Sequence, residues 1–509
     1  MTNLRVTGLP LSQLLAGWAD IAGDSAMEVK GLCLDSRKVQ PGDLFFALAG
    51  SQSHGIRHAE AAAAAGACAI LYDPAAGGAN LVPANLSIPC LPVNDLGQRI
   101  GFIADRFFGE PSLHMDVIGI TGTNGKTSCS HFLASALAHN GPSAVVGTLG
   151  WGLPGSLHPT DHTTPDAIEV HCLLAKLRAR SFATVAMEAS SHGLHQGRLN
   201  GIRFEGGLFT NLSRDHLDYH LTMESYLEAK LRLVSWPGLK FIAFNLDDES
   251  AKAVMARAEG PIRKIGYTLD ESHVPVNGIE IVQASSIKHS QHGISFDVHF
   301  GKQAARIFAP LFGSFNVENL MGVIAVLLAK GFPLTEITQR LEKVRAVPGR
   351  MERFCSDQGA TAVVDYAHTP DALEKALSSL RLHCRGLLWV VFGCGGDRDR
   401  GKRPQMGSIA ESLANHVILT DDNPRSEDGD AIIADIIGGC KRRDITVQRD
   451  RHLAITYALE QLGPDDVLLI AGKGHEDTQE IKGVKQPFSD REVVTQWLGL
   501  AEKRRSVCA

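Results

Sequence analysis

The stretch Val117–Ser128 constrains the fold of this chain more than any other part of the sequence. It begins with an apolar run that predicts a short buried strand. A loop that contains Gly122 and Gly125 follows. Lys126 and Thr127 then open a segment whose apolar residues recur at helical spacing. A strand, a glycine-rich loop, a Lys-Thr pair and a helix is the order of elements in a phosphate-binding loop.

Such a loop binds phosphate because glycines let backbone N–H groups close around phosphate oxygens, and the helix N-terminus adds partial positive charge. Lys126 is placed to reach the β- and γ-phosphates of a nucleotide, and the Thr127 hydroxyl is placed to hold Mg²⁺. The strict motif has a glycine where this chain has Ile120. A glycine-rich turn with an exposed lysine is therefore the alternative.

Length and composition exclude several classes of protein. With 509 residues the chain is long enough for about three domains, each with its own core. A net charge of −6 provides no general basic surface for nucleic acid. Ten cysteines without a Cys-x-x-Cys pair indicate a reducing compartment rather than disulfides or zinc. No apolar run approaches the ~18 residues of a membrane span, so we expect a cytoplasmic, monomeric protein without membrane insertion.

Short apolar runs alternate with helical segments along the whole chain and predict an α/β fold of three domains. We expect a small N-terminal α/β domain at residues 1–110 and a P-loop domain with a mostly parallel sheet at residues 111–347. Residues 348–509 are expected to form a Rossmann-like α/β domain.

Three further residues of the central region are candidates for metal binding. Glu188 ends an apolar strand, where a phosphate-loop enzyme can place a metal-binding acid; a solvated acid is the alternative. His216 lies in a polar segment after the next strand, and is either a ligand of a second divalent ion or a surface residue. Lys230 falls on the semi-apolar face of a helix. It either extends its amine to water or loses its proton and adds CO₂ to become a metal-binding carbamate.

Three polar motifs permit both a structural and a functional interpretation. The segment Asp35–Arg37 is either a turn with a local side-chain bond or a loop that holds a polar ligand. The hydroxyls of Thr163 and Thr164 either bind an anion or cap a helix that opens at Pro165. Asn316, together with Asn319, is expected to precede the helix 320–328, as a cap or as a contact to adenine.

The last third of the chain carries charged clusters after four predicted strands, at 362–365, 387–392, 416–420 and 467–471. In an open parallel sheet these strand ends line the ligand crevice. A pairing of Arg398 and Arg425 with Glu476 would suit a ligand that carries both carboxylate and ammonium groups. Surface salt bridges are the alternative.

Together these motifs resemble the Mur ligase family, ATP-dependent enzymes that form the amide bonds of bacterial cell-wall precursors. The loop at 119–127 resembles the family's phosphate loop, including its departure from the strict motif. The segments at 188–192, 211–216 and 228–230 resemble the family's metal-site segments. The resemblance covers essentially the whole chain and implies three domains, which bind a UDP-linked substrate, ATP and an amino acid in that order.

Within the family, the motifs at 35–37, 163–165, 396–399, 422–425 and 472–476 are similar to those of ligases that add the third residue. Asp-Asn-Pro-Arg at 422–425 is the most specific, because diaminopimelate has one carboxylate more than lysine and an arginine binds a carboxylate bidentately. His162 is a departure, since an asparagine is expected there. The resemblance implies addition of meso-2,6-diaminopimelate to the D-glutamyl γ-carboxylate of UDP-N-acetylmuramoyl-L-alanyl-D-glutamate through an acyl phosphate, in peptidoglycan synthesis and hence in cell shape and division.

The resemblance also implies a role for each matched residue. Contacts to the ATP phosphates fall to Gly122, Thr123, Asn124, Gly125, Lys126, Thr127 and Ser128, and further ATP contacts to Asn316, Arg350, Asp365 and His368. The metal ligands would be Thr127 and Glu188 for one Mg²⁺, and His216 and carbamylated Lys230 for a second. With Lys126, the residues Glu188, His216 and Lys230 form the expected catalytic set.

Substrate contacts are implied in the same way. The UDP part would contact Leu34, Ser36, Ser51, Gln52 and Ser53, and the muramoyl-peptide part Thr163, Thr164, Ser190, Gln196 and Arg198. Diaminopimelate would contact Arg398, Asp422, Asn423, Pro424, Arg425, Gly472 and Glu476. Because ATP and the amino acid are expected on different domains, domain closure should align them and exclude water.

Three other functions compete with this interpretation. A lysine-adding ligase has the same chemistry but has no use for Arg425, whose uncompensated charge would disfavour the lysine ammonium. A folylpolyglutamate synthetase shares the ATPase core, but lacks the N-terminal α/β domain and the Asp-Asn-Pro-Arg motif. A nucleotide-binding switch without ligase chemistry leaves the charged strand ends of the third domain unexplained.

Overall fold

The computed structural model of the chain describes residues 8–18, 27–50, 53–274, 276–355, 359–441 and 445–508. The backbone divides into two compact units. The first contains Met1–Tyr267, Val274–Ile281 and Ala325–Gly331. The second contains Thr268–His273, Val282–Ile324 and Phe332–Ala509.

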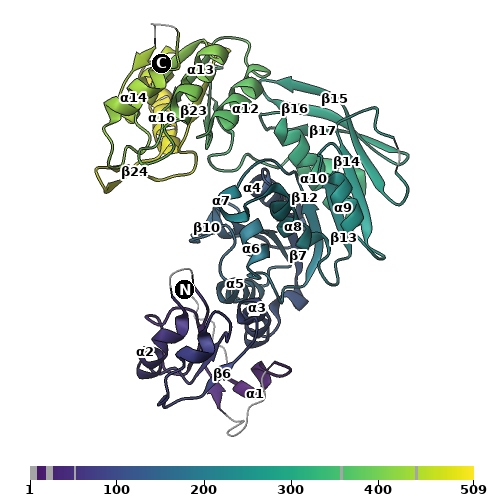
Figure 1. Cartoon of the computed structure of the whole chain (residues 1–509). Helices are drawn as coiled ribbons and strands as arrows, with labels where there is room; N and C mark the ends of the chain where they lie inside the picture. The colour runs from purple at the N-terminus through teal and green to yellow at the C-terminus, as the bar shows by residue number, and fades with distance from the viewer. Residues whose placement is uncertain are drawn as a thin grey trace. The chain divides into compact units, whose positions relative to one another are not determined.

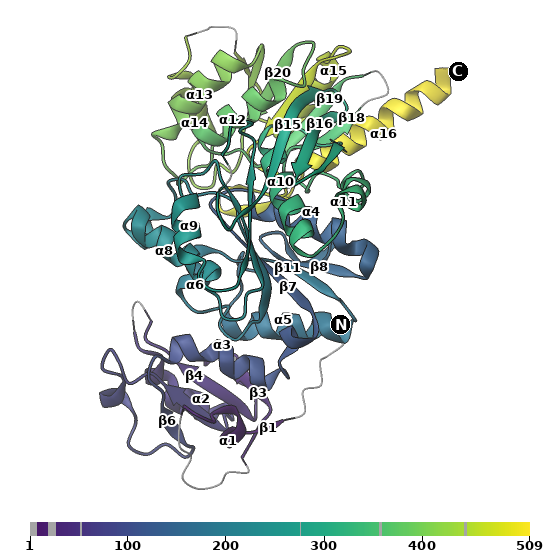
Figure 2. The ribbon, with the colours of Figure 1, turned by 90° about the vertical axis from the view of Figure 1, so that its right-hand side faces the viewer.

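The N-terminal part of the first unit is a small parallel sheet with the strand order β3-β4-β5-β6. Figure 2 shows α3 beside this sheet. Alternate residues of β4 point to opposite faces: Leu44 and Phe46 pack against α1 and α3, while Phe45 and Ala47 pack against α2. The elements are β1 (Leu9–Pro10), α1 (Leu11–Leu14), β2 (Glu28–Val29), β3 (Gly31–Cys33), β4 (Asp43–Ala47), α2 (Ala59–Ala64), β5 (Ala69–Tyr72), β6 (Cys90–Pro92) and α3 (Leu96–Phe107).

The rest of the first unit is built on strands in the order β10-β9-β8-β11-β7-β12-β13-β14. The strands from β8 to β14 pair in parallel, except that β9 and β10 form an antiparallel edge. The elements are β7 (Asp116–Thr121), α4 (Lys126–Leu137), β8 (Ser143–Gly147), β9 (Gly150–Leu153), β10 (Ser156–His158), α5 (Ala167–Ala179), β11 (Thr184–Glu188), α6 (Ser191–His195), β12 (Phe204–Phe209), α7 (Leu217–His220), α8 (Met223–Val234), β13 (Phe241–Asn245), α9 (Ala251–Arg257) and β14 (Arg263–Thr268).

Helices cover both faces of this sheet. One face packs against α5, α6, α8 and α9 in a single apolar cluster, and α8 and α9 lie beside β12 and β13 in Figure 1. Helix α4 contacts β7, β8 and β11. Because β7 is paired in parallel with both β11 and β12, the ends of these three strands meet at one edge of the sheet. Glu188 pairs with Ile120 in this register, which brings it beside the phosphate loop.

The second unit contains most of an antiparallel ladder of β15, β16 and β17, followed by two helices, the first of which ends within the first unit. The bounds are β15 (Glu280–Ser290), β16 (Gly293–Phe300), β17 (Gln303–Ala309), α10 (Phe315–Ala329) and α11 (Leu334–Leu341). Helix α10 begins at Phe315, so Asn316 and Asn319 lie within its first turns. The prediction that both asparagines precede the helix is therefore wrong, because the helix starts earlier than the apolar run.

The remaining sheet of the second unit has the order β18-β19-β23-β20-β21-β22, and only β18 is antiparallel. Helices α12, α13 and α14 pack on one face, and α15 and α16 on the other. The bounds are β18 (Glu352–Cys355), β19 (Thr361–Asp365), α12 (Pro370–Arg381), β20 (Leu388–Phe392), α13 (Lys402–Leu413), β21 (His416–Leu419), α14 (Gly429–Ile437), β22 (Thr446–Val447), α15 (Arg451–Gln461), β23 (Val467–Ala471), β24 (Thr478–Ile481), β25 (Val484–Pro487) and α16 (Asp490–Cys508).

The elements at the candidate sites agree with the sequence patterns. The strand and helix predicted around the phosphate loop are β7 and α4, so both predictions are confirmed. The four strands predicted to carry charged clusters are β19, β20, β21 and β23.

None of the helices in the described ranges is both long enough and apolar enough to cross a membrane. The nine cysteines from Cys33 to Cys440 are free thiols.

Candidate active site

The phosphate loop is fixed by the segment that follows β12. The backbone N–H of Thr123 donates to the Asn211 carbonyl at 2.9 Å, and that of Asn124 donates to the Asn211 side-chain oxygen at 2.9 Å. The Thr210 hydroxyl donates to the Asn124 carbonyl at 2.6 Å. Gly122 has φ +142°, and a Cβ there would clash with the Thr210 hydroxyl. The loop therefore needs a glycine at this position for two reasons, backbone conformation and space.

Helix α4 begins directly after Gly125, whose φ is +85°. The first N–H groups of a helix have no acceptor within the helix, so the N-terminus at Lys126–Ser128 is suited to an anion. The Lys126 amine donates to the carbonyls of Gly122 and Thr123, at 2.9 Å each. The Lys126 side chain thus lies across the loop. When a nucleotide binds, its phosphate oxygens would replace these carbonyls as acceptors.

Glu188 is 1% exposed and faces the start of α4. Its carboxylate accepts hydrogen bonds from the Thr127 hydroxyl at 3.1 Å, from the Thr148 hydroxyl at 2.9 Å and from the Thr148 backbone N–H at 3.0 Å. Burial raises the pKa of Glu188, while the charge of Lys126 and these hydrogen bonds lower it. The hydroxyl and the carboxylate form an oxygen donor pair of the kind that Mg²⁺ prefers.

Lys230 is also almost fully buried, with 1% of its surface exposed. Its amine donates to the Gly122 carbonyl at 2.7 Å and lies 4.5 Å from the centre of the Tyr226 ring. Burial lowers the pKa of Lys230 well below its usual value, and the charge of Lys126 lowers it further. The alternative that this lysine extends its amine to water is therefore wrong. A buried amine with a lowered pKa gives up its proton more readily, as carbamate formation requires.

His216 comes from the loop before α7 and has about half of its side chain exposed. It lies 3.5 Å from the Asp215 carboxylate, and its ring centre is 6.0 Å from that of Tyr226. Lys230 contacts the same tyrosine ring, so the structure brings the two predicted ligands to one neighbourhood. Within the described ranges, no group of three or more His, Cys, Asp or Glu side chains could hold a metal ion alone. Mg²⁺ in phosphate-binding enzymes usually has few protein ligands, and phosphate and water supply the others.

Five residues predicted to contact the muramoyl-peptide form one network beside Glu188. Thr164 donates to the Glu188 carbonyl at 2.8 Å and accepts from the Ser190 backbone N–H at 3.0 Å. Arg198 donates to the Thr164 carbonyl at 2.8 Å and to the Gln196 side-chain oxygen at 2.9 Å.

Thr163 completes this network through its neighbour on β8. Its hydroxyl lies 3.0 Å from that of Thr148, which also binds the Glu188 carboxylate. The alternative role of Thr163 and Thr164 as helix caps is wrong, because α5 begins at Ala167 and is capped by the Asp166 carboxylate.

The residues predicted to contact UDP lie in the N-terminal part of the first unit. Leu34 and Ser36 are half-buried, Ser53 is exposed, and Ser51 and Gln52 lie outside the described residues. Between the first two, the Asp35 carboxylate accepts hydrogen bonds from the Arg37 guanidinium at 2.8 and 2.9 Å, which lowers the pKa of Asp35 to about 2. The local side-chain bond of the structural interpretation is thus present.

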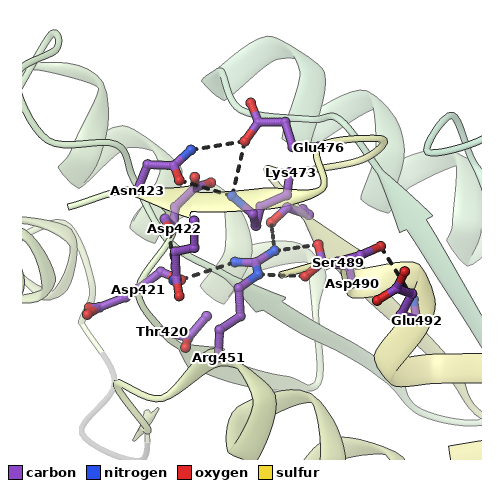
Figure 3. Close-up of polar contacts among 12 residues, drawn as sticks. Thr420, Asp421, Asp422, Asn423, Arg451, Lys473, Glu476, Ser489, Asp490 and Glu492 are labelled. Atoms are coloured by element: carbon purple, nitrogen blue, oxygen red, sulfur yellow. Dashed lines mark hydrogen bonds and ion pairs between the residues drawn. The ribbon is translucent and has the colours of Figure 1, made fainter. Parts of the chain in front are cut away.

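The second unit gathers charged residues at the ends of β21 and β23 (Figure 3). The Lys473 amine donates to the Glu476 carboxylate and to the Asn423 side-chain oxygen, at 3.0 Å each. The Asn423 amide N–H donates to Glu476 at 2.9 Å. Glu476 is therefore bound by Lys473 and Asn423. Neither Arg398 nor Arg425 is among its partners in the described residues, and the combination of these three residues around a ligand stays a prediction.

Arg425 adopts φ +52° at the end of the Asp422–Arg425 loop. Its guanidinium donates to the Gly396 carbonyl at 2.7 Å, and its Nε lies 3.7 Å from the Glu480 carboxylate. Pro424 before it is buried, and Arg398 is exposed on the loop after β20. Both arginines thus follow strand ends of the same sheet edge.

Asp422 and Gly472 meet at this edge. The Asp422 carboxylate occupies the space that a Cβ at Gly472 would need, and the φ of Gly472 is +117°. The Gly472 backbone N–H donates to the Asp365 carbonyl at 3.1 Å, which ties the loop after β23 to the end of β19.

Three of the predicted ATP contacts of the second unit surround Tyr366. The Arg350 guanidinium lies 4.6 Å from the centre of the Tyr366 ring, and His368 Nδ1 is 2.8 Å from the Tyr366 carbonyl. Asp365 accepts hydrogen bonds from the backbone N–H groups of residues 351 and 367; burial raises its pKa, and the charge of Arg350 lowers it. The fourth, Asn316, is 2% exposed and donates its side-chain N–H to a carbonyl of residue 312.

Comparison with known protein families assigns each part of the chain. Residues 28–108 match the model described as Mur ligase family, catalytic domain; residues 120–327 match the Mur ligase middle domain; residues 349–474 match the Mur ligase, glutamate ligase domain. The chain belongs to the Mur ligase family. It is an ATP-dependent, amide-forming ligase with the three-domain α/β architecture of that family.

Similar proteins cover this Mur ligase from end to end. A UDP-N-acetylmuramoyl-L-alanyl-D-glutamate--2,6-diaminopimelate ligase of Alkalilimnicola ehrlichii is 47% identical over 97% of this chain and 99% of its own length. The ligase of the same name from Coxiella burnetii is 45% identical over 96% and 99% of the two chains. A solved structure titled with that name superposes with a TM-score of 0.74 at 36% identity, and covers 97% of this chain and 100% of the other.

Several residues of these sites carry no role in the sequence-based prediction. Thr148 donates a hydrogen bond to the Glu188 carboxylate, the Tyr226 ring contacts the Lys230 amine, and the Lys473 amine donates to the Glu476 carboxylate. Lys473 lies between two glycines just after a buried strand, and this position could have indicated that it belongs to the site. Thr148 and Tyr226 have no such signal, because a threonine at a strand end and a tyrosine on an apolar helix face are ordinary.

Proposed function

We propose that this Mur ligase adds meso-2,6-diaminopimelate to the D-glutamyl γ-carboxylate of UDP-N-acetylmuramoyl-L-alanyl-D-glutamate and consumes ATP in the reaction. The relatives named for that activity are 45–47% identical to it over nearly its full length. In the structure, the observation that supports the choice of amino acid is the edge of the second-unit sheet. There the loop Asp422–Arg425 follows β21, and its Asn423 binds Glu476 of the loop after β23. The product is a precursor of peptidoglycan.

The first step activates a poor electrophile, the γ-carboxylate of the UDP-linked substrate. A carboxylate oxygen attacks the γ-phosphorus of ATP, the bond from that phosphorus to the bridging oxygen breaks, and ADP leaves. Lys126 and the N-terminus of α4 bind the phosphates and stabilise the negative charge that develops on them. The network of Thr164 and Arg198 holds the peptide end of the substrate beside Glu188.

The donor sets of the first unit fit two Mg²⁺ ions. Thr127 and Glu188 would hold one, and His216 with carbamylated Lys230 would hold the second; when bound, the ions offset phosphate charge. The carbamate forms when the neutral Lys230 amine attacks CO₂, with formation of a C–N bond and loss of a proton. The hydrogen bond from Thr148 orients the Glu188 carboxylate toward Thr127.

The second step forms the amide. The amine of diaminopimelate attacks the acyl carbon, and the tetrahedral intermediate expels phosphate. Arg425, together with Arg398, binds the carboxylates of the amino acid, since a guanidinium fork pairs with a carboxylate bidentately. Asp422 and Glu476 bind its ammonium groups, and Asn423, Pro424 and Gly472 shape the site. Lysine lacks the second carboxylate and leaves a guanidinium without a partner.

The remaining assignments are proposals of the same kind. Leu34, Ser36 and the segment 51–53 contact the UDP part, and Arg350, Asp365 and His368 contact ATP, with Asn316 as a further candidate. The domains extend over residues 1–110, 111–347 and 348–509, and each matched family range falls within one of them. The nine free thiols suit the reducing cytoplasm. The chain acts there as a monomer.

One assay tests this function against its rivals. Release of phosphate is measured with ATP and the UDP-linked dipeptide, together with meso-diaminopimelate, L-lysine or no amine. We expect turnover with diaminopimelate only. Turnover with lysine alone would contradict the specificity, and turnover without an amine would indicate a simple ATPase. An intact-mass increment of one CO₂ that is absent from Lys230→Met tests the carbamate.

A further inference from the structure

Arg451 and Asp490 form a buried ion pair behind the amino-acid site (Figure 3). Both side chains are 0% exposed, and the guanidinium donates to the two carboxylate oxygens at 2.7 and 2.8 Å. Removing two charges from water costs free energy that their attraction often fails to recover, and apolar pairs of similar volume frequently replace such pairs without loss of stability. Folding stability alone is therefore a weak reason for this pair.

The same guanidinium also contacts the backbone where two loops of the site begin. Arg451 Nη2 donates to the carbonyl of Ala471 at 3.0 Å, and Nη1 donates to the carbonyl of Asp421 at 3.5 Å. Ala471 is the last residue of β23 and precedes Gly472; Asp421 precedes Asp422. Arg451 is the first residue of α15, and its guanidinium is rigid and planar. This one group thus binds the residue that precedes each of the loops Asp422–Arg425 and Gly472–Glu476.

Charge connects the pair to the site as well. The Asp422 carboxylate is buried, which raises its pKa; the positive charges of Arg451 and Lys473 lower it, and the negative charges of Glu476 and Asp490 raise it. From Asp490 outward, charges alternate through Arg451, Asp422 and Lys473 to Glu476. Arg451 is 2% exposed, so it reaches no ligand itself and acts only through these neighbours.

We propose that Arg451, oriented by Asp490, is a positioning residue of the amino-acid site, which sets the loops Asp422–Arg425 and Gly472–Glu476 in register with one another. Its charge also favours the ionised form of Asp422, and an anion there is what an ammonium group of the amino acid requires. This inference rests on the function proposed above, because it assigns both loops to the amino acid.

The decisive variant replaces both charges, Arg451→Met with Asp490→Leu. A merely structural pair would be replaced without loss of activity, since the apolar side chains fill similar space. For a positioning pair we expect the variant to fold, with a thermal unfolding midpoint near that of the wild type. Its KM for the amino acid should rise about tenfold or more, because methionine cannot bind the two backbone carbonyls, while KM for ATP stays within about twofold.

Two further variants complete the test. Arg451→Lys keeps the charge beside Asp490 but lacks the planar fork, so we expect the same rise in KM, about threefold to tenfold, even if the double variant does not fold. Lys375→Met removes an exposed ion pair with Asp371 on α12 and should change neither KM.

The outcomes separate the two proposals. If the wild type fails to use meso-diaminopimelate, the proposed function is wrong, and the KM comparison is made with the amine that it does use. If the wild type uses it, and both Arg451 variants keep the wild-type KM for the amino acid, the positioning role is wrong. Equal losses in the KM values of ATP and the amino acid would likewise contradict it, because they indicate a general structural defect.

Discussion

The two candidate sites of this ligase differ in whether backbone or side-chain groups form them. In the first unit the phosphate loop consists of backbone: Gly122 and Gly125 give it its shape, and backbone hydrogen bonds to Asn211 hold it. In the second unit the amino-acid site consists of side chains from separate loops, such as Asn423 and Glu476, which form a hydrogen bond with one another. The shape of the phosphate loop depends on its own glycines, whereas the amino-acid site depends on which loops the fold brings together.

This difference predicts different responses to mutation. A substitution in the phosphate loop should impair catalysis for every amine, because all turnover requires the acyl phosphate. A substitution in the amino-acid site should change mainly the KM of one substrate, because the neighbouring side chains continue to support the loops. The following predictions test that contrast, from the largest expected effect to the smallest.

Lys126→Ala should lower kcat by about a thousandfold with any amine, because the phosphates lose the positive charge nearest to them. Steady-state release of ADP measures this effect. Lys240→Ala, which removes an exposed lysine of the same unit, is the control and should keep wild-type activity. If kcat of Lys126→Ala falls by less than tenfold, the ATP phosphates do not bind at this loop.

Arg425→Ala should raise KM for meso-diaminopimelate about a hundredfold and leave KM for ATP unchanged, because a bidentate charge-assisted pair is lost from one substrate only. Initial rates at varied concentrations of each substrate measure both constants. An unchanged KM for the amino acid would refute the proposed role of Arg425. A parallel rise in KM for ATP would show that the two sites are not separable.

Acid should destabilise both units through buried neutral histidines. Burial lowers the pKa of His131 on α4 and that of His383 after α12 to about 4. In the folded state both therefore bind a proton less readily than in the unfolded state, where the pKa is about 6.5. Their contribution to stability is complete above pH 6.5 and is lost as the pH falls toward 4.

For His131 the expected loss between pH 8 and pH 5 is about 2 kcal/mol. Urea unfolding of the wild type and of His131→Gln at both pH values measures it, since the variant lacks the titrating group. At His383 protonation would also break the hydrogen bond that Nε2 accepts from the Gly313 N–H at 3.2 Å. Equal pH dependence of the wild type and His131→Gln would contradict the prediction.

The smallest effect is expected at Glu480, whose carboxylate lies 3.7 Å from Arg425 Nε. Glu480→Gln should lower KM for meso-diaminopimelate about twofold to fivefold, because the carboxylate competes with the substrate for the same guanidinium. The effect should shrink at high salt, since both side chains are partly exposed. Glu460→Gln on α15 is the control, and a rise in KM at Glu480 would reverse the inference.

The contrast between the sites also explains what could be predicted from the sequence. The phosphate loop, its strand and its helix were predictable because Gly122, Gly125 and Lys126 stand in one local motif. The position of Glu188 followed from a strand end. The hydrogen bond between Glu476 and Asn423 did not follow, because it depends on the distance between two loops, which local sequence does not contain.

The same reasoning applies to the residues without a predicted role. Arg451 opens an ordinary helix, and nothing around it in the sequence indicates that it is fully buried against Asp490. The start of α10 before Asn316 was also unpredictable from apolar spacing, because its first turn carries polar residues. In a fold of this kind, a site that the backbone forms can be predicted from the sequence. A site that side chains of separate loops form is harder to predict.

The carbonyl of Gly122 accepts hydrogen bonds from two amines, those of Lys126 and Lys230. Two neighbouring ammonium groups repel one another, and this repulsion helps to lower the pKa of Lys230. A nucleotide that draws Lys126 to its phosphates changes that repulsion, so nucleotide binding and the proton occupancy of the Lys230 amine before carbamylation are thermodynamically linked. The heat of nucleotide binding should therefore depend on the ionisation enthalpy of the buffer, and calorimetry in different buffers would count the protons exchanged.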